Sequence, residues 1–343
     1  MMILPLCRGY VKAFSGDFCE FGASLRRFAE GRLGEVIAGT NCVRLFPCMV
    51  SSLIFVGIPR HGGINPKPIV TSEILCYNEE KLQNEEEQPM FKTGVVSVTF
   101  RKLAAEKILT LASEARLTGI EWGGDIHVPH GDMDAALDVK FLTDEASLDN
   151  ISYGSYYKMT GSHEEWNEVL MCAESLCVPN VRVWAGNKGS ADTSPSERKR
   201  IIAEAQMIAD MLEFDGGTSI SFEYHSGTLT DTPESAVELV KSIDRGNVKL
   251  YWQPNQFRSH EDNLKGLDLV MPYLSNVHLF AWEGHEKFML EHHRQRWIEY
   301  LDRIKLYNEK SECALIMEFV KDDSPEQFKR DAEELHNIIR LVG

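Results

Sequence analysis

Four short apolar stretches in the second half of the chain each contain one metal-binding side chain near their C-terminal end. These side chains are Glu223, Gln253, His278 and Glu318. Carboxylate and imidazole groups together suit Mn, Co, Zn or Fe, whereas a site made only of oxygen ligands would suit Mg. The amide of Gln253 supplies an oxygen but no negative charge. We therefore expect this set to bind a metal ion less tightly than a set with three carboxylates.

Glu223 and Glu318 are also the candidates for acid-base chemistry. A single Glu at the end of a strand is explained equally well by an ion pair with a Lys or Arg nearby. Two of them, with a His and an amide on the strands between, favour a functional site. Two carboxylates placed in this way could work as a general acid and a general base.

A regular alternation of strands and helices would bring these four positions together. Predicted strands cover residues 94–100, 119–122, 151–156, 180–184, 218–223, 248–252, 276–280 and 313–319. Predicted helices lie near residues 101–116, 134–148, 163–176, 194–214, 233–243, 260–272, 289–309 and 324–342. Strict alternation predicts a parallel sheet, and eight units within residues 90–343 favour a single α/β domain, a closed (β/α)8 TIM barrel. The C-terminal ends of barrel strands converge on one site.

Several helix starts have a clear signal in the sequence. Ser194, Thr232 and Ser324 each precede a Pro, and a Glu follows within two residues of that Pro. A polar cap satisfies exposed backbone amides, and Pro is favoured at the first helical position. We therefore predict that helices begin at these three points.

Residues 1–89 do not share this pattern, and we predict that they form an irregular N-terminal extension. Gly, Pro and Cys are scattered through them without a sustained apolar period. The extension is expected to be poorly ordered or a small added subdomain. The alternative is a misplaced start, because purine-only codons for Glu85 to Glu87 would resemble a ribosome-binding site just ahead of Met90. The natural chain would then begin at Met90.

Histidines and an arginine near the predicted strand ends are candidates for binding substrate. His127 and His130 lie in a Gly-rich loop after the second strand, where they could contact substrate hydroxyls. Two His three residues apart also allow a metal site, but this spacing is weak evidence in a loop. Arg182 lies within an apolar strand, and a buried Arg needs a partner. It either orients a carboxylate such as Glu223 or binds an anionic group of the substrate.

Aromatic residues and one lysine complete the candidates at the strand ends. Tyr153, Trp184 and Trp282 are either packing residues or surfaces on which a sugar ring stacks. Lys321 follows the eighth strand and is the best-placed cation for a phosphate group. Lysines and arginines at the strand ends are otherwise scattered, so we do not expect a phosphorylated substrate in particular.

The composition argues against several function classes. The chain has 343 residues, 43% of them hydrophobic, and a formal net charge of −16. Residues 90–343 contain 27 Lys and Arg against 42 Asp and Glu. An acidic domain without basic runs binds neither nucleic acid nor anionic membranes well, because both depend on cationic contacts. The 8 cysteines form no CxxC pair and no regular framework, so we expect reduced thiols and a cytoplasmic protein.

Nucleotide-binding and nucleophile-elbow motifs are also missing from the sequence. No GxGxxG follows a predicted strand, and neither GxxxxGK[ST] nor GxSxG occurs. The expected partner is therefore a small molecule, and a homo-oligomer stays open.

From Met90 onward, the chain resembles the xylose isomerase-like TIM barrels known as sugar phosphate isomerases/epimerases. The similar stretches are GIEWGGDIH at 119–127, SYGSYY at 152–157, VRVWAG at 181–186, and FEYH at 222–225 followed by GTLTDT at 227–232. The resemblance extends over the whole predicted barrel and none of residues 1–89. It implies an isomerase or epimerase that acts on a sugar or sugar phosphate. The expected reaction is proton transfer at the carbon next to the carbonyl, with one glutamate removing the proton, the other returning it, and a divalent metal stabilising the enediolate.

The resemblance also implies roles for particular residues. In ketose 3-epimerases of this family a divalent metal is held by Glu, Asp, His and Glu on strands five to eight. By position these become Glu223, Gln253, His278 and Glu318, so Gln253 stands where the family has Asp. Gln256 likewise stands where the family has a substrate-contacting His. Metal identity, whether Mn, Co, Mg or Zn, is left open by these departures.

The resemblance leaves further roles and functions open. His225 and Arg182 are expected to support the first glutamate. A metal-dependent hydrolase or lyase of the same family is one alternative function. The acidic barrel argues against DNA repair of the endonuclease IV type. A sugar-binding barrel that has lost its metal and its activity is the other alternative.

Overall fold

The computed structural model describes residues 36–38, 41–43, 91–159, 163–215, 217–307 and 313–343. Eight parallel strands within these ranges form a closed barrel, in the order β12-β3-β4-β5-β6-β7-β8-β9. The barrel strands are β3 (Phe91–Val96), β4 (Gly119–Gly123), β5 (Asp149–Gly154), β6 (Asn180–Val183), β7 (Ser219–Glu223), β8 (Val248–Trp252), β9 (Leu274–Leu279) and β12 (Cys313–Met317). The predicted (β/α)8 barrel is therefore confirmed.

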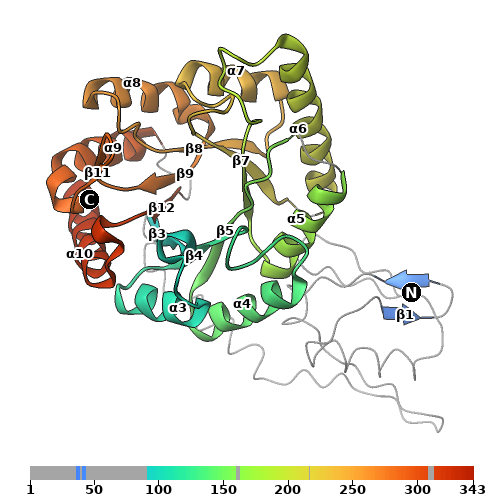
Figure 1. The fold of residues 1–343 in the computed structure, drawn as a ribbon, viewed down its shortest axis with the longest axis horizontal. Coiled ribbons are helices and arrows are strands. Elements are labelled where there is room, and N and C mark those ends of the chain that lie inside the picture. The colour runs from blue at the N-terminus through green and yellow to red at the C-terminus, as the bar shows by residue number, and fades with distance from the viewer. Residues whose placement is uncertain (1–35, 39–40, 44–90, 160–162, 216, 308–312) are drawn as a thin grey trace, which may run out of the picture.

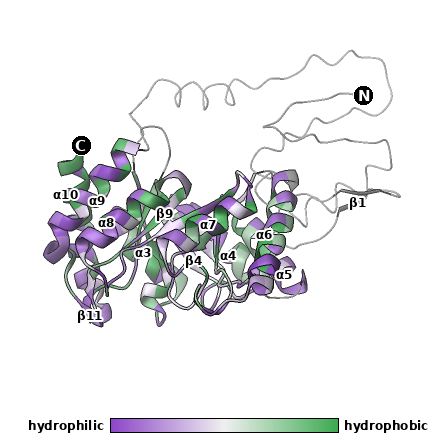
Figure 2. Ribbon diagram, turned by 90° about the horizontal axis from the view of Figure 1, so that it is seen from above, coloured by the Kyte–Doolittle hydropathy of each residue, from purple (hydrophilic) through white to green (hydrophobic). Residues whose placement is uncertain are grey.

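Helices surround the strands as an outer ring (Figure 1). They are α3 (Ala105–Glu114), α4 (Met133–Glu145), α5 (His163–Leu176), α6 (Pro195–Asp215), α7 (Pro233–Ile243), α8 (His260–Val270), α9 (Arg294–Tyr307) and α10 (Pro325–Val342). Hydrophobic and hydrophilic residues alternate along these helices (Figure 2). Their apolar faces cover the strands in the main core, which includes Trp122, Phe222, Trp252 and Phe328. Such amphipathic faces stabilise helices by packing rather than by intrinsic propensity.

The predicted helix starts are confirmed. Thr232 accepts a hydrogen bond from the backbone N–H of Ser235, and Ser324 accepts one from Gln327. Ser194 accepts from the N–H of Glu197, whose carboxylate in turn accepts from the N–H of Ser194. This reciprocal pair is a capping box, which satisfies two otherwise exposed donors.

The first strand begins three residues earlier, and ends four residues earlier, than the sequence predicts. Strand β3 ends at Val96, and Ser97–Phe100 forms the 3-10 helix η2 instead. The run of valine and threonine there is typical of a strand, but its side chains have other partners. Ser97 accepts a hydrogen bond from the N–H of Gly123, and Thr99 accepts one from Phe319. These contacts hold η2 across the C-terminal end of the barrel.

Short elements interrupt the predicted segment between β9 and α9. A hairpin of β10 (Trp282–Glu283) and β11 (Glu286–Lys287) precedes the 3-10 helix η4 (Leu290–His293). Two further 3-10 helices are η3 (Met271–Tyr273) and η5 (Lys321–Asp323). The helix predicted at 289–309 is therefore a 3-10 turn followed by α9, and residues 308–312 lie outside the described part of the chain.

The N-terminal prediction is largely untested by the structure. Strands β1 (Val36–Ala38) and β2 (Asn41–Val43) pair antiparallel, with Val36 opposite Val43. The rest of residues 1–90 lies outside the described residues, so both the extension and the alternative start at Met90 stay predictions. In the part of the chain that the structure describes, no helix combines the length and the apolar character that crossing a membrane requires.

A polar layer fills the barrel below its C-terminal end. The amide of Asn180 donates to the hydroxyl of Ser221 at 2.7 Å, and the amide of Asn276 donates to the hydroxyl of Tyr251 at 2.8 Å. Successive side chains alternate across a strand, so residues two apart point the same way. Glu223 therefore lies one layer above Ser221, and His278 lies one layer above Asn276.

Candidate metal and acid-base site

The four predicted metal ligands meet around one imidazole nitrogen. Nδ1 of His278 lies 3.2 Å from Oε1 of Gln253. It also lies 3.5 Å from Oε2 of Glu318 and 3.7 Å from Oε1 of Glu223. Donor atoms of Glu223, His278 and Glu318 all fall within 4.8 Å of one another. All three are buried, with 4%, 0% and 9% of their surfaces exposed.

Local backbone geometry aims two of these side chains. Gln253 precedes Pro254, which favours extended backbone at the preceding residue. Its Nε2 donates to the carbonyl of Tyr224 at 2.9 Å, so its Oε1 faces His278. The chain turns after Glu318 because Phe319 adopts a φ of 53°, which is rare for a residue other than Gly.

Arg182 joins two carboxylates inside the barrel. Its Nε donates to Oε1 of Glu121 at 2.7 Å, and its Nη1 donates to Oε2 of Glu223. The guanidinium is 1% exposed. Gly154 leaves the space for it, since a Cβ there would lie 2.5 Å from Nη2 of Arg182. Of the two roles considered for Arg182, the structure therefore places it as a partner of site carboxylates.

Glu121 on β4 is a site residue that the sequence reasoning did not single out. Its carboxylate is fully buried, and its Oε1 lies 3.3 Å from Nε2 of His278. Metal-binding histidines usually donate their second ring N–H to a carboxylate or carbonyl, which fixes the ring. The sequence did contain a sign of this role: Glu121 is a charged residue among apolar ones in its strand, just as Arg182 is in its own.

Burial and charge act in opposite directions on the buried acids. Burial alone would raise the pKa of Glu121, but Arg182 and His278 outweigh it and lower the pKa to about 2. Burial likewise opposes ionisation of Glu223, yet the Arg182 guanidinium holds its pKa below the usual range. Glu318 differs, because burial and the nearby Glu223 carboxylate raise its pKa despite the attraction of His278. The pKa values of the two acid-base candidates, Glu223 and Glu318, are therefore shifted in opposite directions.

The donor set fits a divalent cation. Two carboxylates, one amide oxygen and one imidazole nitrogen surround a common point, and these are the ligand types that Mn, Co and Zn accept. Glu318 is a buried carboxylate, and His278 is the group that can offset its charge. The same imidazole also lies close to the carboxylates of Glu121 and Glu223. A metal ion would offset this excess of negative charge.

Aromatic rings form one wall beside Glu223. Nε1 of Trp184 donates to Oε2 of Glu223 at 2.6 Å. The ring of Trp184 stacks on His225, with centroids 4.6 Å apart, and meets Tyr156 edge-on. Lys158 lies over the same ring at 5.4 Å. Trp184 and His225, both predicted to bind substrate, therefore lie next to the base candidate.

The histidines of the loop after β4 have protein partners. His127 contacts Ser97 Oγ at 2.9 Å and the Leu103 carbonyl at 3.1 Å. Nε2 of His130 lies 2.6 Å from the carbonyl of Ser155. Tyr153 is fully buried and donates to the carbonyl of Val128 at 2.7 Å. These bonds tie the loop to η2, to the segment before α3 and to the end of β5, and the substrate-binding roles of the three residues stay predictions.

The remaining predicted residues lie farther round the barrel mouth. Gln256 and Trp282 line a cavity of about 320 Å³ between the loop after β8 and the β10–β11 hairpin. Nε1 of Trp282 donates to the carbonyl of Phe319 at 3.3 Å, next to Glu318. Lys321 lies half-buried in η5, directly after this turn. The structure does not bring Lys321 into the group around His278, and its role is a prediction.

Comparisons with known proteins found similarity in sequence and in overall fold. No family model matches the sequence. A 3-dehydroshikimate dehydratase from Bacillus anthracis is 26% identical over 146 residues, which are 42% of this chain. The match spans about half the length of that relative.

Solved structures resemble the barrel over most of their length. The probable 3-DHS dehydratase AsbF from Bacillus anthracis superposes with a TM-score of 0.57 and 19% identity, and the match includes 72% of this chain and 99% of that one. A xylose isomerase-like TIM barrel protein from Mycobacterium smegmatis, in complex with magnesium, superposes with a TM-score of 0.56 and 15% identity. That match includes 74% of this chain and 97% of the other. This chain has the fold of the xylose isomerase-like TIM barrels. A D-psicose 3-epimerase from Clostridium cellulolyticum shares the same fold, with a TM-score of 0.55 and 12% identity over 74% and 99% of the two chains.

The resemblance inferred from the sequence is thus confirmed for the fold. Proteins with the xylose isomerase-like fold include epimerases and a dehydratase. At these identities the fold does not identify a substrate. Function has to be argued from the residues around His278.

Proposed function

We propose that this xylose isomerase-like barrel is a metal-dependent isomerase or epimerase that moves a proton at the carbon next to a sugar carbonyl. The supporting observation is the pairing of Glu223 and Glu318 across Nδ1 of His278, with pKa values shifted in opposite directions. Titratable pairs tuned apart in this way are typical of acid-base sites.

Each glutamate has its own role in this reaction. Glu223 is ionised and held by Arg182 and Trp184, so it is the base that removes the proton. Glu318 holds a proton more readily and returns one from the other side. Return to the same carbon from the opposite face gives epimerisation, and return to the neighbouring carbon gives isomerisation.

Glu223, Gln253, His278 and Glu318 would hold the metal ion. When bound, it would supply Lewis-acid polarisation of the carbonyl oxygen and stabilise the enediolate. The residues of the chain supply the orientation. Trp184 and His225 present a flat stacked surface beside Glu223, which suits the apolar face of a sugar ring.

Proton exchange tests this function directly. The protein, stripped of metal and reloaded with Mn²⁺, is incubated in deuterated water with a panel of ketoses and keto-acids. Deuterium is expected to enter the carbon next to the carbonyl of at least one substrate, and chelation of the metal should stop it. No exchange on any member of the panel, with folded and metal-loaded protein, would rule the proposal out.

A dehydratase is the second candidate, favoured by the match to the 3-dehydroshikimate dehydratase. Removal of the same proton by Glu223 can be followed by loss of the hydroxyl on the next carbon as water, with Glu318 donating the proton that the leaving hydroxyl needs. Incubation with 3-dehydroshikimate and mass spectrometry separates the two functions. Loss of one water from the substrate supports the dehydratase, and deuterium incorporation without loss of mass supports the epimerase.

Metal content separates both enzymes from an inactive sugar-binding barrel. Uptake of Mn²⁺ or Co²⁺ at micromolar concentration that is lost in His278→Ala favours catalysis, and protein with no uptake that depends on His278 favours binding alone. A cytoplasmic location and self-association are also proposals. The buried thiols of Cys172 and Cys313, neither of them in a disulfide, are compatible with a reducing compartment.

A further inference from the structure

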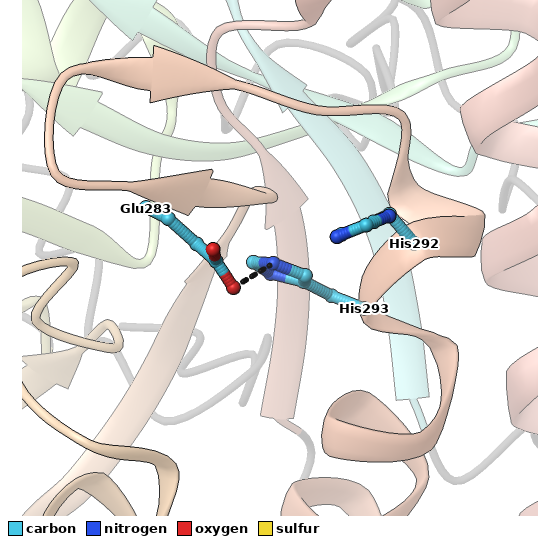
Figure 3. Close-up of side chains that lie close together, drawn as sticks. All are labelled: Glu283, His292 and His293. Carbon is cyan, nitrogen blue, oxygen red and sulfur yellow. Dashed lines mark ion pairs between the residues drawn. The ribbon is translucent and has the colours of Figure 1, made fainter.

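We propose that Glu283, His292 and His293 form a second metal site, for Zn²⁺ or a similar transition-metal ion, outside the barrel mouth. One donor atom from each residue lies within 4.8 Å of the other two. The three side chains point toward one another, from β10 and from η4 (Figure 3). None of them belongs to the group around His278.

The hairpin and the 3-10 turn bring these residues together. Strand β11 returns the chain past β10, and the N–H of Phe288 donates to the carbonyl of Ala281 at 2.7 Å. The ring of Phe288 then stacks on His292, with centroids 4.6 Å apart and planes 14° apart. This stack limits the rotation of His292 and keeps its imidazole beside His293.

The separation of the donors suits a tetrahedral ion. Nε2 of His293 lies 3.3 Å from Oε1 of Glu283. Zinc bonds of about 2.0 to 2.2 Å place two ligands of a tetrahedron roughly 3.4 Å apart. His293 is 5% exposed, so the surrounding side chains restrict the position of its ring. His292 is exposed, which leaves an entry path for the ion.

The site would keep one coordination position open. Glu283 and His293 both line the cavity of about 320 Å³ that also contains Gln256 and Trp282. Three protein ligands with a free fourth position are typical of zinc sites that bind water or a ligand, whereas structural sites have four. We therefore expect the fourth position to be filled by water from this cavity.

Arg296 contacts two of the three proposed ligands. Its Nη2 donates to Oε1 of Glu283 at 2.7 Å, and its Nη1 lies 3.4 Å from Nε2 of His293. The two donors thus already face a positive charge. A metal ion has to displace this guanidinium, so Arg296 should weaken metal binding, and its removal should strengthen it.

Calorimetric and spectroscopic titration with Co²⁺ and Zn²⁺ tests the site on the full chain after chelation. The wild-type protein is compared with His292→Ala/His293→Ala, Glu283→Gln and Arg296→Gln. His285→Ala is the matched control, because it removes an exposed histidine of the same hairpin that lies outside the cluster.

The double-histidine variant is expected to bind one metal ion fewer per protein than the wild type. Glu283→Gln should bind this ion more weakly. His285→Ala should leave it unchanged, and Arg296→Gln should tighten it about tenfold. The readout is the difference in bound metal ions between the wild type and each variant, rather than the total number bound. The result therefore does not depend on whether the barrel-mouth site binds metal. Equal stoichiometry in the wild type and the double-histidine variant, with both proteins folded by circular dichroism, would overturn the proposal. Weaker binding in Arg296→Gln would also contradict it.

Discussion

Nε2 of His278 lies 3.3 Å from Oε1 of Glu121, while Nδ1 of the same ring faces Gln253, Glu223 and Glu318. Glu121 therefore holds the ring so that Nδ1 is available to a metal ion. Replacing Glu121 by Gln should weaken Mn²⁺ binding about 10- to 100-fold, the usual cost of losing such an orienting partner. Calorimetric titration measures this. Glu334→Gln, a buried glutamate on α10 paired with Arg294, is the matched control and should bind normally.

Glu318→Gln should abolish most of the turnover without unfolding the barrel. The amide keeps the shape of the side chain but cannot transfer a proton, and general acid-base groups contribute roughly 10²- to 10⁴-fold. The rate of deuterium exchange on a responsive substrate is the measurement. Wild-type exchange in this variant would remove Glu318 from the mechanism.

Gln253→Asp should tighten metal binding by at least about tenfold, which corresponds to roughly 1.4 kcal/mol. The substitution adds a negative charge where the amide oxygen now faces Nδ1 of His278. Gln253→Asn shortens the side chain equally but adds no charge, so it separates the two effects. Equal affinity in Asp and Asn variants would show that charge at this position does not control binding.

Metal affinity should rise with pH through the range in which His278 titrates. Burial alone would lower the pKa of His278, but Glu318 and Glu121 outweigh it and raise the pKa above its ordinary value. Below that raised pKa the imidazole holds a proton on the nitrogen that the metal needs, so binding must release it. Affinity is expected to fall about tenfold per pH unit on the acid side and to level off above the pKa. Calorimetry in buffers of different ionisation enthalpy counts the proton, and a pH-independent affinity would contradict the role of Nδ1.

Trp184→Phe should lower kcat/KM about tenfold at neutral pH. The change removes the N–H that donates to Glu223 but keeps a ring for the stack with His225. Hydrogen bonds to charged groups contribute roughly 1.5 to 3 kcal/mol. Because the lost bond favours the ionised carboxylate, the acid limb of the pH profile should move to higher pH. A profile that keeps its position would mean that Trp184 acts only by packing.

Most of the fold and the group around His278 could be predicted from the sequence for a simple reason. The stretches that lead to Glu223 and Glu318 are largely apolar, so a Glu at the end of each stands out. Glu121 gave the same signal in the middle of its strand. Its role depends on contacts with Arg182 and His278, residues 61 and 157 positions away, which a local pattern does not show.

Other features depend on contacts that no local pattern shows. Ser97–Phe100 is rich in β-branched residues, yet hydrogen bonds from Gly123 and Phe319 hold it as a 3-10 turn. The cluster of Glu283, His292 and His293 depends on a hairpin whose strands have two residues each. Strands this short have no period to detect.

The salt link of Arg182 to two carboxylates has a consequence for selectivity. When Glu318 has given up its proton, Glu121, Glu223 and Glu318 carry three negative charges. Arg182 and a divalent ion would supply three positive charges, with His278 neutral. The metal-loaded site would then be electroneutral. An uncharged polyol enters it without needing a counter-ion, so its capture should be insensitive to ionic strength. A substrate with a carboxylate group would need a further cation to pair with. Lys158, whose ammonium lies over the ring of Trp184, is the candidate for that ion pair.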